Sequence, residues 1–138
     1  MDDSIYSRTS TAVSKYLLYM LELFGGSTAI SEKAIISRDA SMVVCFEKIT
    51  TEHIAARSGA DGNTFTENER DCLGNLTLLG DNKNNELDDK PFSIKRDVYV
   101  KSPYALTRTV GANLKWERDE YNSLQKHQKD NAIKIFIL

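Results

Sequence analysis

Cysteine is scarce in this chain, and its two cysteines cannot form a paired zinc motif. Cys45 and Cys72 are the only cysteines among 138 residues. Their positions differ by 27 (72 minus 45), so no CxxC pair is present. This spacing excludes a zinc knuckle and favours a reduced, cytoplasmic setting over a disulfide framework. We expect both side chains to be small and buried.

Long apolar runs are also missing, and we do not expect the first residues to be a leader sequence. The longest apolar run, residues 16–21, has six residues, whereas a membrane span needs roughly 20. The first residues, Met1-Asp2-Asp3-Ser4, are acidic and polar, unlike a signal peptide. Gly25-Gly26 is not followed by the GK[ST] of a phosphate loop. We therefore expect a soluble, cytoplasmic protein, and nothing in the chain matches a phosphate loop.

The chain is long enough for one domain, and its charges are unevenly distributed. It has 138 residues, 41% hydrophobic, with a net charge of −2 that argues against indiscriminate coating of nucleic acid. Residues 47–89 hold ten acidic and four basic side chains, and residues 90–115 hold six basic and one acidic. Carboxylates for a cation beside basic groups for phosphates are typical of a metal-dependent phosphodiesterase, although a solvated charged surface gives the same pattern.

Apolar periodicity and turn residues predict a mixture of helices and strands. Strands are expected within residues 43–53 and over 76–79, separated by a loop at 57–64 and a short helix. Thr66 and Glu69 form a capping box that begins this helix, which is expected to run to about residue 73. The other helices are expected over residues 11–24, after Ser27 or Thr28, after Asp81-Asn82, over 92–100, and from Trp116 to about residue 130, before an apolar tail at 133–138.

Residues 52–95 contain side chains that suit phosphodiester hydrolysis. Glu52-His53 ends the first strand, Asn75 precedes the second, and Asn84 follows nine residues later. Carboxylate and amide oxygens bind a hard cation, an imidazole takes a proton from water, and a second amide can hold that imidazole. This order predicts an HNH, or ββα-metal, nuclease. Taken singly, His53 would more often be a structural histidine, Asn75 a turn residue and Asn84 a helix cap.

The same residues resemble a known family. The matching pieces are Glu52-His53-Ile54, residues 73–79 (Leu-Gly-Asn-Leu-Thr-Leu-Leu), residues 84–87 (Asn-Asn-Glu-Leu) and residues 90–95 (Lys-Pro-Phe-Ser-Ile-Lys). They look like the HNH domain at the C-terminus of GmrSD-type restriction enzymes, which serve in bacterial anti-phage defence and include the nicking partner of phosphorothioate-based systems. The resemblance extends upstream to residues 16–22 and downstream to Trp116 and residues 132–136.

The resemblance implies a role for each matching residue. His53 would be the general base, Asn75 its orienting amide, and Glu52 and Asn84 the ligands of Mg²⁺ or Mn²⁺. Lys95 would contact a phosphate or the transition state. The further DNA contacts that we predict are Arg57, Lys83, Lys90, Arg96, Lys101 and Arg108.

The chain departs from the family pattern at two places. Ala55-Ala56-Arg57 stands where the family has a proline two residues after Glu-His-Ile. This change is expected to loosen the loop behind the base, with Arg57 contacting a phosphate instead. Leu124 stands where the family tends to carry arginine, so the phosphate contact or ion pair of that arginine is not expected here.

We therefore predict an α+β fold with a ββα-metal hairpin–helix core. Residues 42–100 would form this core, between a helical flank at 1–41 and a C-terminal helical region at 101–138. The predicted function is metal-dependent cleavage or nicking of DNA in defence against foreign DNA. Its expected partner is an N-terminal nucleotide-hydrolysing domain or subunit outside this chain. The chain itself would then be a separated nuclease domain or a short stand-alone relative of the family.

Two alternatives to this function stay open. One is a non-catalytic DNA-binding or partner-docking module with a decayed HNH site, although binding alone needs no histidine at position 53. The other is cleavage of RNA, because no residue in the chain identifies the sugar.

Overall fold

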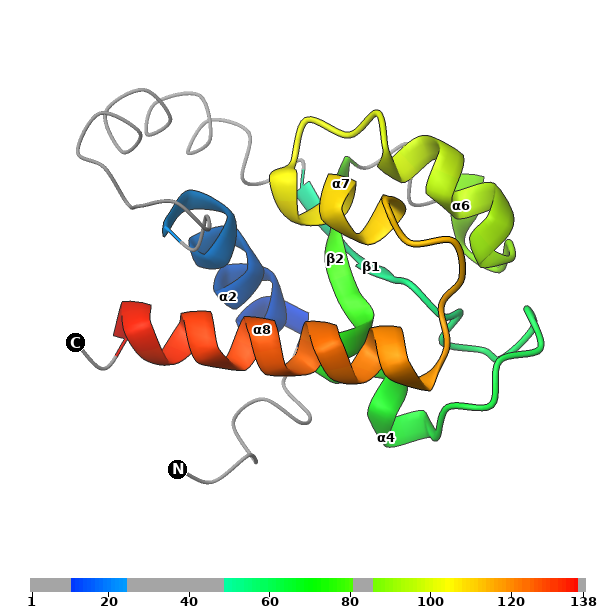
Figure 1. Ribbon diagram of the computed structural model, residues 1–138, viewed down its shortest axis with the longest axis horizontal. Helices are drawn as coiled ribbons and strands as arrows, with labels where there is room; N and C mark the ends of the chain where they lie inside the picture. Colours follow the sequence, from blue (N-terminus) through cyan, green and yellow to red (C-terminus); the bar gives the residue numbers. More distant parts are fainter. Residues whose placement is uncertain (1–10, 25–48, 81–85, 137–138) are drawn as a thin grey trace.

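The computed structural model describes residues 11–24, 49–80 and 86–136 (Figure 1). The helices expected after Ser27 or Thr28 and around Asn84 lie outside these residues. The described elements are helix α2 (Thr11–Phe24), strand β1 (Ile49–His53), helix α4 (Glu67–Arg70), the 3₁₀ turn η2 (Leu73–Asn75), strand β2 (Leu76–Gly80), and helices α6 (Phe92–Tyr99), α7 (Ala105–Gly111) and α8 (Arg118–Phe136).

The two strands form an antiparallel hairpin at the centre of the fold. Ile49 pairs with Gly80 at one end of the register, and His53 pairs with Leu76 at the other. Both strands lie where the sequence predicts them, so the α+β fold class is confirmed. Residues 54–75 connect them, which makes the hairpin loop long enough to carry α4 and η2 of its own.

Strand β2 is buried on both of its faces, which explains its unbroken apolar sequence. Leu76 and Leu78 belong to a core cluster with α2 and Ala132 of α8. Leu79 belongs to a second cluster that contains Tyr99 of α6, and the neighbouring Thr77 hydroxyl lies 2.8 Å from that of Thr107 on α7. Successive side chains of a strand point to opposite faces, so strand β2 contributes side chains to both core clusters.

The connection between the strands is anchored by a capped helix and by the C-terminal helix. Thr66 and Glu69 form the predicted capping box at the start of α4. Gly74, within η2, packs directly on α8: a Cβ there would lie 2.8 Å from Cβ of Gln125. The main-chain N–H of Gly74 donates to the Gln125 side chain over 2.5 Å. Only glycine allows this close approach of the loop to α8.

The C-terminal half is more helical than the sequence predicts. Helix α6 confirms the expectation for residues 92–100, but α8 runs on to Phe136 and includes most of the expected apolar tail. Helix α7 was not predicted. Its first N–H groups, from Ala105 and Leu106, donate to the carboxylate of Glu22 on α2. A cap supplied from so far away leaves no local signal in the sequence.

Two expectations about burial and membranes can be compared with the described residues. Cys72 is buried as a free thiol, as predicted, and Cys45 lies outside the described residues. No helix in the described ranges is both long enough and apolar enough to cross a membrane.

Candidate active site

His53 ends strand β1, and its ring is held by an acidic residue from the hairpin loop. Nε2 of His53 lies 2.9 Å from Oδ1 of Asp71, and the histidine side chain is 24% exposed. Burial lowers the pKa of His53 below its usual value, while the neighbouring Asp71 opposes this shift. The lowered pKa keeps the imidazole neutral at neutral pH, the form that can accept a proton.

Asp71 is the residue of this site that sequence reasoning missed. It follows the last turn of α4, as the residue that caps the C-terminal end of that helix. Nε of Arg57 lies 3.4 Å from the same Asp71 oxygen. Residue 71 has no recognisable spacing from residue 53, and the two meet only because the 54–71 connection folds back beside the strand end.

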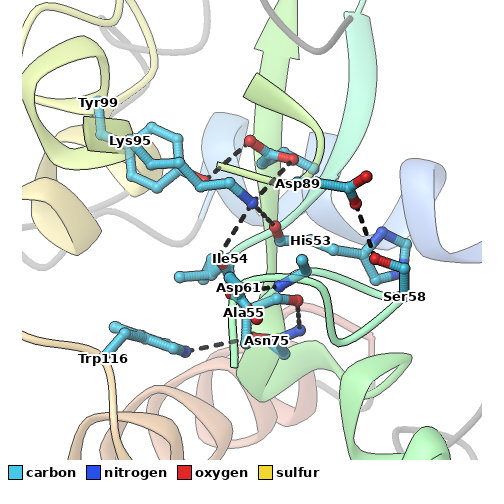
Figure 2. Close-up of polar contacts among 12 residues, drawn as sticks. His53, Ile54, Ala55, Ser58, Asp61, Asn75, Asp89, Lys95, Tyr99 and Trp116 are labelled. Atoms are coloured by element: carbon cyan, nitrogen blue, oxygen red, sulfur yellow. Dashed lines mark hydrogen bonds and ion pairs between the residues drawn. The ribbon is translucent and has the colours of Figure 1, made fainter. Parts of the chain in front are cut away.

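Asn75 binds the segment that follows His53 on both of its polar edges (Figure 2). Its Oδ1 accepts from the N–H of Ala55 at 2.8 Å and from the indole of Trp116 at 3.2 Å. Its Nδ2 donates to the carbonyls of Ala55 and Arg70, both at 3.0 Å. The side chain is fully buried. These contacts are those of an amide that braces the loop; its catalytic role as the orienting amide stays a prediction.

The loop without the family's proline is held by side-chain hydrogen bonds instead. The N–H of Ala56 donates to Asp61 at 2.9 Å, and the Asn63 side chain donates to the carbonyl of Ala56 at 3.1 Å. Arg70 in turn donates to Asn63 at 3.0 Å. The expected loosening of the loop is offset by this network, which the sequence pattern alone did not indicate.

Glu52 points to the opposite side of the strand from His53 and is buried against α6. Its Oε2 accepts from the Tyr99 hydroxyl at 2.9 Å, and its Oε1 lies 3.9 Å from Nζ of Lys95. Only 2% of the residue is exposed. Burial raises the pKa of the carboxyl to about 7, although Lys95 and the Tyr99 hydroxyl oppose the shift.

Lys95 lies in the interior rather than on the surface. Its residue is 0% exposed, and its ammonium donates to the carbonyls of His53 at 2.7 Å and Ile54 at 3.2 Å (Figure 2). Burial lowers the pKa of this amine, and the charge of Glu52 opposes the shift. The phosphate contact stays a prediction, and this placement gives Lys95 a structural role that the motif did not indicate.

The predicted metal ligands are only partly within the described residues. Asn84 and Lys83 lie outside them. Among the described residues, no three histidine, cysteine or acidic side chains are grouped so that they could hold a metal ion. The Glu52 carboxylate has the oxygen chemistry that a hard cation prefers, and a cation at Oε1 would favour its ionised form. Such a cation would, however, face the ammonium of Lys95 at the same oxygen.

The predicted DNA contacts within the described residues are spread over several elements. Arg57, Lys90 and Lys101 are exposed. Arg96 donates to the carbonyl of Asn113 at 2.9 Å, and Arg108 donates to that of Ser102 at 2.8 Å. A guanidinium has five N–H donors, so both arginines keep others for phosphates. Leu124, which replaces the family's arginine, is buried in a core cluster with Trp116 and Tyr121.

Fold and site together define an α+β domain with a braced histidine at the end of its central hairpin. A model of the family described as "GmrSD restriction endonucleases, C-terminal domain" matches residues 1–129. The chain therefore belongs to this family, and the resemblance inferred from its motifs is confirmed. No curated protein and no solved structure matches the chain.

Proposed function

We propose that this domain is a divalent-metal-dependent DNA endonuclease that nicks foreign DNA in bacterial defence. The observation that carries the proposal is the position of His53 at the end of the hairpin, in a chain that belongs to a family of restriction endonuclease domains. A neutral, partly exposed imidazole beside a fixed carboxylate is the arrangement of a general base.

In this proposal His53 takes a proton from the attacking water. The lowered pKa of the ring leaves it unprotonated at neutral pH and ready to accept that proton. Asn75 and Lys95 fix the main chain on either side of the ring, since they bind Ala55 and the His53 carbonyl respectively. Their hydrogen bonds to the main chain keep the imidazole in position.

A Mg²⁺ or Mn²⁺ ion is the proposed cofactor, with Glu52 and Asn84 as its protein ligands. When bound, the ion would supply charge neutralisation at the leaving 3′ oxygen. We propose that a nucleotide-hydrolysing domain or subunit outside this chain acts as its partner.

One observation favours the non-catalytic alternative, a DNA-binding or partner-docking module with a decayed site. The Glu52 carboxylate is already engaged by Tyr99 and lies close to the Lys95 ammonium. A buried, satisfied carboxylate fits a structural ion pair as well as a metal ligand. The two functions differ in one measurable property, because only the nuclease needs the imidazole at position 53.

A plasmid-nicking assay with Mg²⁺, with Mn²⁺ and with EDTA tests the proposal. We expect cleavage in both metals and none in EDTA, and a fall of about 10²–10⁴-fold in rate for His53→Ala, as is typical for loss of a general base. His127→Ala is the matched control, because His127 is the second histidine of the chain and is exposed on α8. Asn84→Ala should raise the metal concentration needed for a given rate.

Each possible outcome separates the candidates. Equal cleavage by the wild type and by His53→Ala would contradict the assignment of the base. Duplex binding without cleavage in either metal would favour the DNA-binding module. A parallel arm with single-stranded RNA decides between DNA and RNA as the substrate.

A further inference from the structure

The carboxylate of Asp71 contacts one of the two ring nitrogens of His53. We propose that Asp71 is a positioning residue that fixes the tautomer of His53, so that Nε2 carries the proton and Nδ1 is the nitrogen that accepts one from water. This inference rests on the proposed nuclease function and assigns a role to a residue outside the motif. The contact that carries it is the 2.9 Å distance between Nε2 of His53 and Oδ1 of Asp71.

A carboxylate decides the tautomer because it can only accept. In a neutral imidazole one nitrogen is a donor and the other is an acceptor. If Nε2 faces the ionised Asp71 oxygen at hydrogen-bond distance, Nε2 must be the protonated nitrogen. Nδ1 then has a free lone pair, and a water that loses its proton to His53 has to approach on that side of the ring.

The carboxylate is presented by a rigid support. Asp71 caps the C-terminal end of α4, whose N-terminal end is closed by the complete Thr66–Glu69 capping box. The residue before Asp71 is also fixed, since the carbonyl of Arg70 accepts from Asn75 at 3.0 Å. Asn75 therefore holds both sides of the contact, the loop after His53 and the end of the helix that carries Asp71.

Three charged groups affect the pKa of the His53 imidazole, and they shift it in different directions. Asp71 favours the charged ring, whereas Arg57 and Lys95 disfavour it. Arg57 lies 3.4 Å from the Asp71 oxygen that contacts His53, so the ring and the guanidinium share that oxygen. Asp71 has a side chain only 14% exposed, which limits competition from water for the hydrogen bond.

Asp71→Asn is the variant that tests this role. An amide keeps the shape of the carboxylate but offers either an oxygen or an NH₂ group to Nε2, so the tautomer is no longer imposed. In hydrolytic triads the same change leaves the geometry intact and inverts the tautomer. We expect kcat for nicking to fall by at least about 10- to 100-fold, the range typical when the partner of a metal-bound imidazole is removed, with KM for DNA unchanged.

The tautomer itself is read from the ¹⁵N shifts of the imidazole at about pH 8, where the ring is neutral. In the wild type we expect a protonated Nε2 and an unprotonated Nδ1 for His53, with His127→Gln to assign the second histidine. In Asp71→Asn we expect the Nδ1–H form to be populated. Asp97→Asn is the matched control, because Asp97 is an exposed carboxylate on α6 and its loss changes the charge equally.

The two readouts keep this inference separate from the proposed function. A wild-type His53 protonated at Nδ1 would overturn the role of Asp71, whether or not the protein cleaves DNA and whether or not the variant folds. A kcat for Asp71→Asn within about twofold of the Asp97→Asn value would overturn it as well. If the wild type cleaves nothing, the proposed function fails, and the spectrum of the wild type still decides the tautomer.

Discussion

The ammonium of Lys95 lies 2.7 Å from the main-chain carbonyl oxygen of His53, and so ties helix α6 to the end of strand β1. The same ammonium lies 3.9 Å from the carboxylate of Glu52, the residue before His53. One buried ammonium therefore pairs with the Glu52 carboxylate and also donates a hydrogen bond to the backbone of the next residue.

We expect Lys95→Met to destabilise the fold by about 3–5 kcal/mol, because removing one member of a buried ion pair leaves the other uncompensated. Glu52→Gln combined with Lys95→Met should cost less than the sum of the two single changes, since neither partner is then left charged and alone. Urea denaturation measures both. Lys90→Met, at an exposed position, is the control and should change stability by less than about 0.5 kcal/mol. An equally small effect of Lys95→Met would contradict the buried contact.

Asn75→Ala should be strongly destabilising, because it removes a fully buried amide that makes four hydrogen bonds through Ala55, Arg70 and Trp116. Each buried partner left without a hydrogen bond costs about 1–3 kcal/mol. We expect a loss of more than about 3 kcal/mol in the free energy of unfolding, measured by urea denaturation. Asn122→Ala, at an exposed position of α8, should leave stability unchanged or slightly raised. Similar midpoints for the two variants would mean that Asn75 does not brace the loop.

The pair of Glu69 and Arg118 predicts a stability difference at low pH. The Arg118 guanidinium and the N–H of Thr66 lower the pKa of Glu69 to about 2. A carboxyl with a lowered pKa contributes stability that is complete above its unfolded value, near 4.5, and is lost as pH falls through about 2. Glu69→Gln keeps an acceptor for the capping box, so it should cost less than about 1 kcal/mol at pH 7. Thermal melts should show this cost shrinking below about pH 4; a constant difference at every pH would contradict the pairing.

Binding of DNA by this chain should be modest, steeply dependent on salt and nearly independent of base sequence. Each phosphate that a basic side chain neutralises adds about 0.9 to the slope of log K against log salt. We expect Lys101→Ala and Arg108→Ala each to lower this slope by about that amount in fluorescence-anisotropy titrations. Lys126→Ala is the control, because Lys126 is exposed on α8 and pairs with Asp130. An unchanged slope for both test variants would place the DNA track elsewhere on the surface.

The local parts of the fold could be predicted because they depend on neighbouring residues. The capping box of α4 and the Leu-Thr-Leu-Leu strand have signals within a few positions, and the structure has both. Helix α7 could not be predicted, since its N-terminus is capped by Glu22, more than 80 residues away in the sequence.

The candidate site divides in the same way. Glu52, His53 and Asn75 belong to a short, ordered motif, whereas Asp71 enters through a turn whose path no local pattern describes. The burial of Lys95 was missed for a different reason. A lysine on an amphipathic helix is normally solvated, and only the packing of α6 onto β1 brings its amine beneath the backbone.

The hydrogen bond from the Trp116 indole to Asn75 spans 41 positions of the chain. Its consequence concerns the order in which the protein is made. While a ribosome synthesises the chain from its N-terminus, His53, Asp71 and Asn75 all emerge from the exit tunnel before Trp116. The loop behind the imidazole therefore gains its last hydrogen bond only when Trp116 has left the ribosome. In a shorter nascent chain, Asn75 lacks its indole donor, and the loop that follows His53 is not yet fully held.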